Sequence, residues 1–98
     1  METGYIDEFA CLARELNYRQ ASKKLFVSQS TLSAHIDHLE AELGFPLFEK
    51  EGRGIKLSAA GVMFLDRSQH LLEDLDDILE ECRDCALKQR GVRVQIWS

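Results

Sequence analysis

The feature that most constrains this chain is a long apolar stripe in its C-terminal half. Small or apolar residues recur alternately three and four positions apart, at Leu65, Ser68, Leu72, Leu75, Leu79, Cys82 and Ala86. This spacing predicts one long helix over about residues 59–89, capped by Ser58. A chain of 98 residues is too short to cover such a stripe alone, so we expect a homodimer through this helix. The residues expected at the dimer contact are Leu65, Leu72, Leu75, Leu79 and Cys82.

Three shorter helices are predicted before the stripe. Apolar residues over 5–16 repeat three and four apart, which is typical of an amphipathic helix. A second helix over about 19–26 is joined by a very tight turn to a third, which Ser28 caps and Gly44 ends. Two helices joined so closely predict a helix-turn-helix.

A small β-hairpin is predicted after the third helix. Residues 47–50 and 55–57 are strand-like runs on either side of a glycine-rich turn. The expected fold is therefore mainly α: a winged helix-turn-helix of three helices and a two-stranded wing, followed by a long dimerisation helix. We divide the chain into a DNA-binding domain (1–58), a linker helix (59–90) and a final strand (91–98) that would begin a missing effector-binding domain.

The composition excludes several classes of protein. No apolar run approaches the roughly 20 residues of a membrane span, and the N-terminus does not resemble a signal peptide, so we expect a cytoplasmic protein with no membrane partner. Three cysteines are too few for a disulfide framework, and no histidine pair completes a metal site with Cys82 and Cys85. No cofactor, metal or enzymatic activity is expected. Cys11 is expected in the core, and His35 and His38 at the surface or as capping residues.

The start of the third helix carries the residues suited to DNA. In a helix-turn-helix the second helix enters the major groove by its N-terminal turn, and hydroxyl and amide side chains there can pair with base edges. Arg53, between two glycines in the wing, suits a narrow minor groove. Arg19 belongs to a stretch of cations free of acids, and Lys50 is a phosphate candidate. The expected DNA-binding residues are Arg19, Ser28, Gln29, Ser30, Thr31, Ser33, Lys50 and Arg53.

The net charge of −5 argues against a nucleic-acid partner, but the distribution of charges along the sequence weakens this objection. Many of the 17 acidic residues lie over 73–84 on the long helix, which can be held away from a duplex. Because phosphate binding depends on local basic charge, the acidic total is tolerable, and it predicts modest affinity.

These residues together resemble the DNA-binding domain of LysR-type transcriptional regulators. The resemblance covers residues 5 to about 65. It is carried by Ala21, Leu25, the run from Val27 to Ser33, Ile36, Leu39-Glu40, Leu43-Gly44, Leu47-Phe48-Glu49, Leu57-Ser58 and Gly61. It implies a dimer that binds an interrupted dyad in double-stranded DNA and, in longer members, an effector domain for a small molecule and a tetramer. This chain departs from the family pattern at Arg19, Ser22, Ala34 and Lys50.

Two alternatives stay open from the sequence. One is a protein-interaction module that has lost DNA binding and acts through its apolar stripe, which the net charge, Ala34 and Asp37 favour. The other is a redox switch at Cys82 and Cys85, which are neighbours on a helix although helix geometry strains a disulfide between them.

Overall fold

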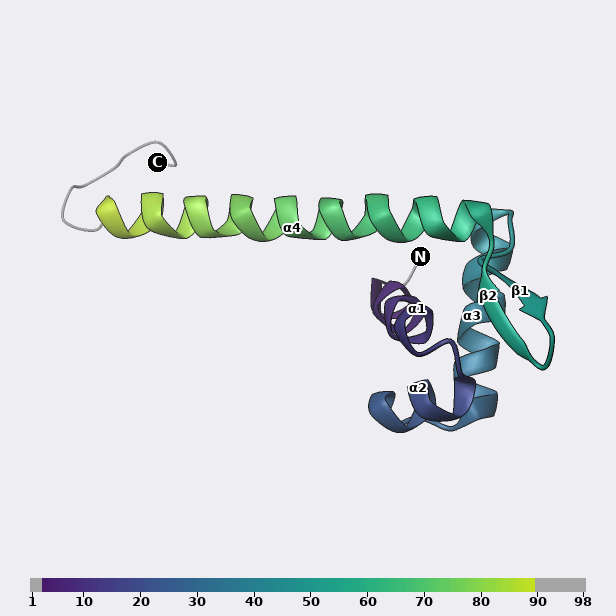
Figure 1. Ribbon diagram of the computed structural model, residues 1–98. Helices are drawn as coiled ribbons and strands as arrows, with labels where there is room; N and C mark the ends of the chain where they lie inside the picture. Colours follow the sequence, from purple (N-terminus) through teal and green to yellow (C-terminus); the bar gives the residue numbers. More distant parts are fainter. Residues whose placement is uncertain (1–2, 90–98) are drawn as a thin grey trace. The chain divides into compact units, whose positions relative to one another are not determined.

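Four helices and one β-hairpin make up residues 3–89, the part of the chain that the computed structural model describes (Figure 1). The elements are α1 (Thr3–Glu15), α2 (Tyr18–Leu25), α3 (Gln29–Leu43), β1 (Phe48–Glu51), β2 (Gly54–Leu57) and α4 (Ala59–Lys88). The described residues up to 66 form one compact unit, and α4 beyond residue 66 belongs to a second. The predicted winged helix-turn-helix and long helix are confirmed. The strand predicted over 91–98 lies outside the described residues.

The caps of α2 and α3 are made by side chains that the sequence supplies at the required positions. The Asn17 side-chain oxygen accepts a hydrogen bond from the Gln20 amide at 2.9 Å, so α2 begins one residue earlier than predicted. Ser28 Oγ accepts from the Thr31 amide at 3.1 Å, as predicted. Gly44 ends α3 with a φ of 83°, which glycine adopts without a steric penalty.

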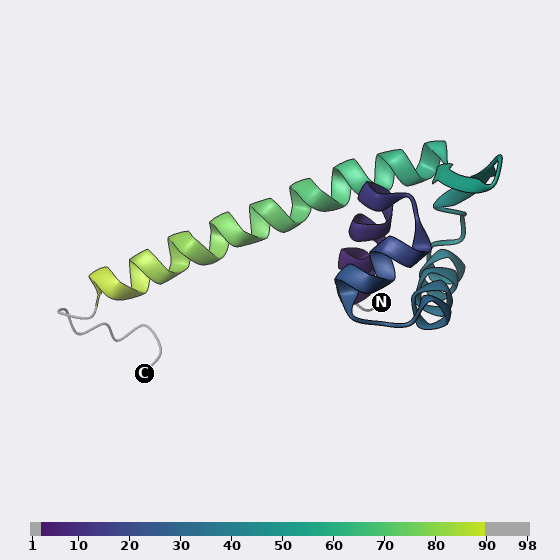
Figure 2. The same ribbon diagram turned by 60° about the horizontal axis from the view of Figure 1, so that its bottom comes forward.

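Two non-glycine residues adopt the left-handed conformation where helices end. Leu16, with φ 50°, follows α1 and is 40% exposed, so it does not extend the buried stripe as expected. Phe26, with φ 58°, ends α2 inside the helix-turn-helix turn, and it is 94% exposed. Figure 2 shows this short connection between α2 and α3. Both residues accept backbone strain to turn the chain sharply.

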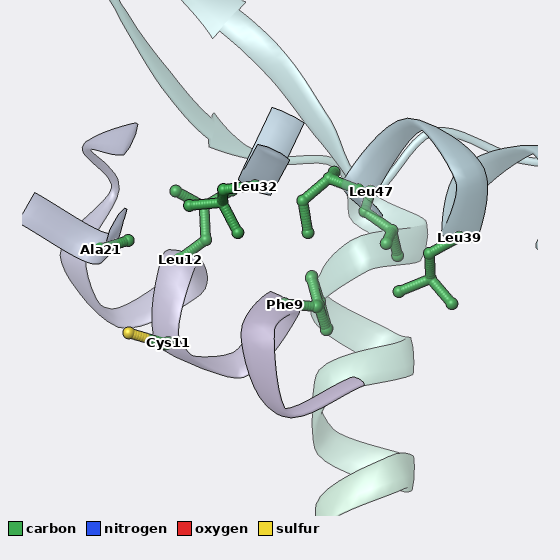
Figure 3. Packing of buried hydrophobic residues seen from close by; sticks show 8 residues of the cluster. Phe9, Cys11, Leu12, Ala21, Leu32, Leu39 and Leu47 are labelled. Carbon is green, nitrogen blue, oxygen red and sulfur yellow. The ribbon is translucent and has the colours of Figure 1, made fainter. Parts of the chain in front are cut away.

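The core of the first unit joins all three short helices (Figure 3). Its buried members are Phe9, Cys11, Leu12, Ala21, Leu32, Ile36, Leu39 and Leu47. Phe9 contacts Phe48 of the hairpin and Phe64 of α4, with ring centroids 5.5 and 5.7 Å apart. The first two turns of α4 are thus packed against the same core through Phe64 and Leu65. Cys11 is buried, as predicted.

The wing is a tight antiparallel hairpin. Phe48 pairs with Leu57 at its base and Glu51 with Gly54 at its end, so Gly52 and Arg53 form a two-residue turn. Gly52 has a φ of 59°, whereas Arg53 does not have a positive φ. A glycine of positive φ at the first central position is the preference of type II′ turns, which suit the twist of a hairpin. The strands are offset by about one residue from the prediction.

Ser58 joins the segment before the wing to the start of α4. Its Oγ donates to the Pro46 carbonyl at 2.6 Å and accepts from the Gly61 amide at 2.9 Å, which confirms the predicted cap. A side chain at Gly61 would overlap the carbonyl oxygen of Leu47, so only glycine allows the two segments to approach this closely.

Candidate nucleic-acid interface

Three hydroxyl groups cluster at the tip of α3. Ser28 Oγ lies 2.9 Å from Thr31 Oγ1 and 3.1 Å from Ser30 Oγ, and all three residues are exposed. Ser28 Oγ is committed to the cap, because it already accepts from the Thr31 amide. Each hydroxyl has one proton and two lone pairs, so Ser30 and Thr31 keep hydrogen-bonding capacity for a ligand. The cluster can therefore offer both donors and acceptors to base edges.

The remaining expected groove residues of α3 differ in accessibility. Gln29 is exposed at the leading edge of the helix, whereas Ser33 is half-buried. Ala34 and Asp37 are exposed on the outward face. The exposed surface of α3 thus begins with hydroxyl and amide groups and continues with a small residue and an acid.

A hollow brings together three of the predicted residues from three different elements. Arg19 of α2, Gln29 of α3 and Arg53 of the wing turn all line it, together with residues 16–18 and 54–55. Its volume is about 260 Å³. The sequence singled out each of these three residues separately, and the fold places them around one concave surface.

Tyr18 supplies a neutral hydroxyl in the same hollow. Burial of its half-buried side chain, reinforced by the negative charges of Asp37 and Glu40, raises the pKa of Tyr18 above its usual 10.0. The phenol consequently stays protonated at neutral pH and can donate a hydrogen bond. Tyr18 was not among the predicted site residues, because only the fold brings it to the same hollow as Gln29 and Arg53.

The other cations near the helix-turn-helix differ in their partners. Lys24 Nζ lies 2.8 Å from a Glu15 carboxylate oxygen, an ion pair that links α2 to the end of α1. Lys56 Nζ lies 3.5 Å from Glu49 across the hairpin. Lys50 is exposed on β1 and does not line the hollow.

His35 lies only partly at the surface, with a side chain 28% exposed, and it makes contacts within the fold that the sequence did not predict. Its Nδ1 lies 2.8 Å from Glu8 Oε1, and its ring stacks on Tyr5 with centroids 4.3 Å apart. The ring is half-buried and joins α1 to α3. His38 is exposed and pairs with Glu42 at 2.6 Å, one turn further along the same helix. Tyr5 and Glu8 are three residues apart on α1, and His35 and His38 are three residues apart on α3. Each pair therefore lies on one face of its helix, but only the fold shows that the two faces meet.

The predicted stripe on α4 is largely open. Leu65 is half-buried against the core of its own chain, so it is partly covered without a second copy. Leu72 is also half-buried. Leu75 and Leu79 are 49% and 40% exposed, and Cys82 is exposed as well. The uncovered apolar surface therefore begins further along α4 than the sequence pattern alone suggested.

Other kinds of site find little support in the described part of the chain. Between residues 3 and 89, no group of three acidic, histidine or cysteine side chains is placed to hold a metal ion. No helix within these residues is both long and apolar enough to cross a membrane. Cys82 and Cys85 are exposed free thiols on α4.

Comparisons with known proteins agree with this geometry. Residues 6–62 match the family described as bacterial regulatory helix-turn-helix protein, lysR family. The chain is 40% identical over 91 residues to the transcriptional regulator BudR of Klebsiella aerogenes, covering 93% of this chain and 64% of BudR. It thus spans less than two thirds of the length of that relative.

Two solved structures have the same architecture. The complex of the CbnR DNA-binding domain with DNA matches with a TM-score of 0.78 at 36% identity, covering 88% of this chain and 99% of that one. The complex of the BenM DNA-binding domain with benA site 1 DNA matches with a TM-score of 0.77 at 30% identity, covering 88% and 97%. The family consists of transcriptional regulators rather than enzymes. This chain belongs to the LysR family of bacterial regulatory helix-turn-helix proteins.

Proposed function

We propose that this chain binds double-stranded DNA in a sequence-specific manner and that it does so as the DNA-binding part of a transcription regulator. The observation that carries the proposal is the exposed hydroxyl cluster at the tip of α3, in a fold shared with the DNA complexes of CbnR and BenM. In this proposal Gln29, Ser30 and Thr31 contact base edges in the major groove.

The remaining predicted contacts have different roles in this proposal. Ser28 acts mainly by holding the tip of α3 in shape, because its hydroxyl caps the helix. The half-buried Ser33 can reach only a base edge or phosphate close to the helix surface. Lys50, exposed on the wing, contacts a phosphate and contributes affinity without sequence preference.

We also propose a homodimer through α4. Leu75, Leu79 and Cys82 form an apolar surface whose exposure to water is unfavourable. A second copy of the chain has the same surface, so the two can bury each other. Two helix-turn-helix units held in this way would bind two half-sites of an interrupted dyad. Effector binding and tetramer formation stay predictions from the family resemblance, as does the division into residues 1–58, 59–90 and 91–98.

Selection of duplexes from a library with a randomised centre tests the proposal. We expect the wild-type chain to enrich a sequence with two related half-sites, and the logarithm of its affinity to fall linearly with the logarithm of the salt concentration. Gln29→Ala should lose about 1–3 kcal/mol of discrimination at one base pair of each half-site. Gln69→Ala, which removes an exposed glutamine from α4, is the matched control and should leave the preference unchanged.

A dimer without DNA binding would contradict the proposal. If the wild-type dimer enriches no sequence and shows no salt-sensitive duplex binding, the chain is an interaction module and the proposal is wrong.

A further inference from the structure

Three aromatic rings form a continuous contact between α1 and α3. Tyr5 of α1 stacks on His35 of α3, with ring centroids 4.3 Å apart and ring planes 18° from parallel. Tyr5 also meets His38 in a T-shaped contact, with centroids 5.7 Å apart and planes at 89°. Because one contact is stacked and the other is edge-on, the arrangement depends on how α3 is oriented relative to α1.

A carboxylate holds each of the two imidazole rings as well. His35 Nδ1 lies 2.8 Å and 3.1 Å from the two oxygens of Glu8 on α1. A carboxylate can only accept a hydrogen bond, so the imidazole donates it. The side chains of His35 and Glu8 are 28% and 16% exposed, which limits competition from water. His38 Nε2 lies 2.6 Å from Glu42, which holds the second ring against its own helix.

These contacts lie on a side of α3 that also carries part of the hydroxyl cluster. Thr31, His35, His38 and Glu42 follow one another at spacings of four, three and four residues, so they share one side of the helix. Thr31 is exposed, and its Oγ1 lies 2.9 Å from Ser28 Oγ. A movement of α3 relative to α1 at His35 therefore also moves the Thr31 hydroxyl, one helical turn away.

The core holds α3 by contacts that tolerate small rotations about the helix axis. The buried residues of this helix are Leu32, Ile36 and Leu39, and apolar burial has no preferred direction. A hydrogen bond, in contrast, weakens steeply when its angle changes. The bond between His35 and Glu8 consequently resists small rotations that the apolar contacts allow.

We propose that Glu8 and His35 are positioning residues that set the base preference of α3 without contacting DNA. This inference rests on the proposed function and deepens it. The hydrogen bond between them, with Tyr5 stacked on the imidazole, fixes the rotation at which Gln29 and Thr31 meet the base edges. Contacts to phosphates tolerate small rotations better than contacts to bases, so loss of this bond should reduce discrimination between duplexes more than affinity for duplexes in general.

The first experiment measures discrimination, because a purely structural role would leave it unchanged. The affinity of each variant is measured for the duplex that the wild-type chain selects and for the same duplex with one changed base pair in each half-site. Both measurements use one protein preparation, so the ratio of the two affinities does not depend on how much of the protein is folded. Glu8→Ala should lower this ratio by about 3- to 10-fold. Glu8→Gln, which keeps an acceptor oxygen for His35, should retain most of it.

Asp7→Ala is the matched control. Asp7 is an exposed carboxylate next to Glu8 in α1, so its removal changes the net charge of the chain equally. It should leave the ratio unchanged. His35→Phe keeps a ring that can stack on Tyr5 but loses the Nδ1 donor, and it should lower the ratio as Glu8→Ala does. If Glu8→Ala does not fold, His35→Phe carries the same test.

The second experiment asks whether Glu8 acts through the tip of α3. Gln29→Ala is combined with Glu8→Ala and, separately, with Asp7→Ala. If Glu8 sets the orientation of α3, Gln29→Ala should lose less discrimination in the Glu8→Ala background than in the wild type. In the Asp7→Ala background it should lose as much as in the wild type.

Two results would overturn the proposal. One is an unchanged ratio in Glu8→Ala and His35→Phe, whatever happens to their melting temperatures, because the contact would then only stabilise the fold. The other is additivity of Glu8→Ala and Gln29→Ala in discrimination. Failure of the proposed function would look different, because the wild-type chain would then select no duplex at all.

Discussion

Gly61 shows how a single residue can determine the junction between the wing and α4. It lies in the first turn of α4, where alanine would normally favour the helix by up to about 1 kcal/mol. A Cβ at this position would overlap the Leu47 carbonyl oxygen, which is itself bonded to the Ser58 amide at 2.9 Å. The backbone would have to move at a point where three segments meet.

We therefore expect Gly61→Ala to destabilise the protein by about 1–3 kcal/mol, against its helix propensity. Gly4→Ala is the matched control, because Gly4 is also helical and nothing lies within 4 Å of its would-be Cβ. Urea unfolding of both variants checks this prediction. Equal midpoints for Gly61→Ala and the wild type would show that the junction can yield.

Tyr18 makes stability depend on pH in the alkaline range. Its pKa is raised in the folded protein, mainly by burial, so the folded state holds the proton more tightly than the unfolded state does. The stability from this group is complete below pH 10.0 and is lost as the pH rises through the folded value. We expect Tyr18→Phe to lose less stability than the wild type above pH 10, as measured by thermal unfolding at a series of pH values. Parallel losses in the two proteins would contradict this.

At the residue scale, the sequence predicted those structural roles that depend only on residues close by in the chain. The caps at Ser28, Gly44 and Ser58 could be predicted because each depends on residues within a few positions. The His35 contact with Glu8 could not, because 27 residues separate the partners and only the packing of α1 on α3 brings them together. For the same reason, the hollow around Arg19 and Arg53 became visible only in the fold.

Among the elements, the wing depends on one side chain of α3. Glu40 Oε2 accepts from the Leu47 amide at 2.6 Å and from the Phe48 amide at 3.4 Å, so the end of α3 holds the start of β1. A four-residue hairpin strand has little stability of its own. The position of the wing therefore depends on this carboxylate and on the packing of Phe48 against Phe9.

We expect Glu40→Ala to cost about 1–3 kcal/mol, because it leaves a partly buried backbone donor without its partner. Hydrogen exchange at the Leu47 amide should accelerate in this variant. Glu49→Ala is the control, since it removes an exposed carboxylate in a 3.5 Å pair with Lys56, and it should change stability by less than about 1 kcal/mol. Protection of the Leu47 amide that survives Glu40→Ala would contradict the anchoring role.

Element boundaries were predictable to within about one residue wherever a cap marks them. The boundary of α2 moved because Asn17, rather than a later residue, makes the capping hydrogen bond. The strands shifted because a two-residue turn at Gly52 and Arg53 pairs Glu51 with Gly54, which the glycine-rich sequence alone did not distinguish from a longer turn.

For the whole molecule, the apolar stripe of α4 is the surface on which assembly depends. Leu75 and Leu79 are expected at the centre of the dimer contact. Leu75→Asp would place a charge among apolar side chains without a partner, which is strongly unfavourable. We expect this variant, and Leu79→Asp likewise, to be monomeric in multi-angle light scattering and to bind a two-half-site duplex far more weakly than the wild type.

Leu87→Asp is the control for both variants. Leu87 is 58% exposed on the same helix, but it lies outside the three-and-four spacing of the stripe. It should remain dimeric. Dimers that persist in Leu75→Asp and Leu79→Asp would place the contact elsewhere.

Phe26 has a practical consequence for anyone who handles this protein. An almost fully solvated phenyl ring sits on a backbone that asparagine or glycine would occupy more comfortably. The chain consequently has an exposed apolar side chain and a strained backbone at the same residue. Replacing Phe26 by asparagine or glycine should therefore reduce aggregation during crystallisation or concentrated storage without changing the core.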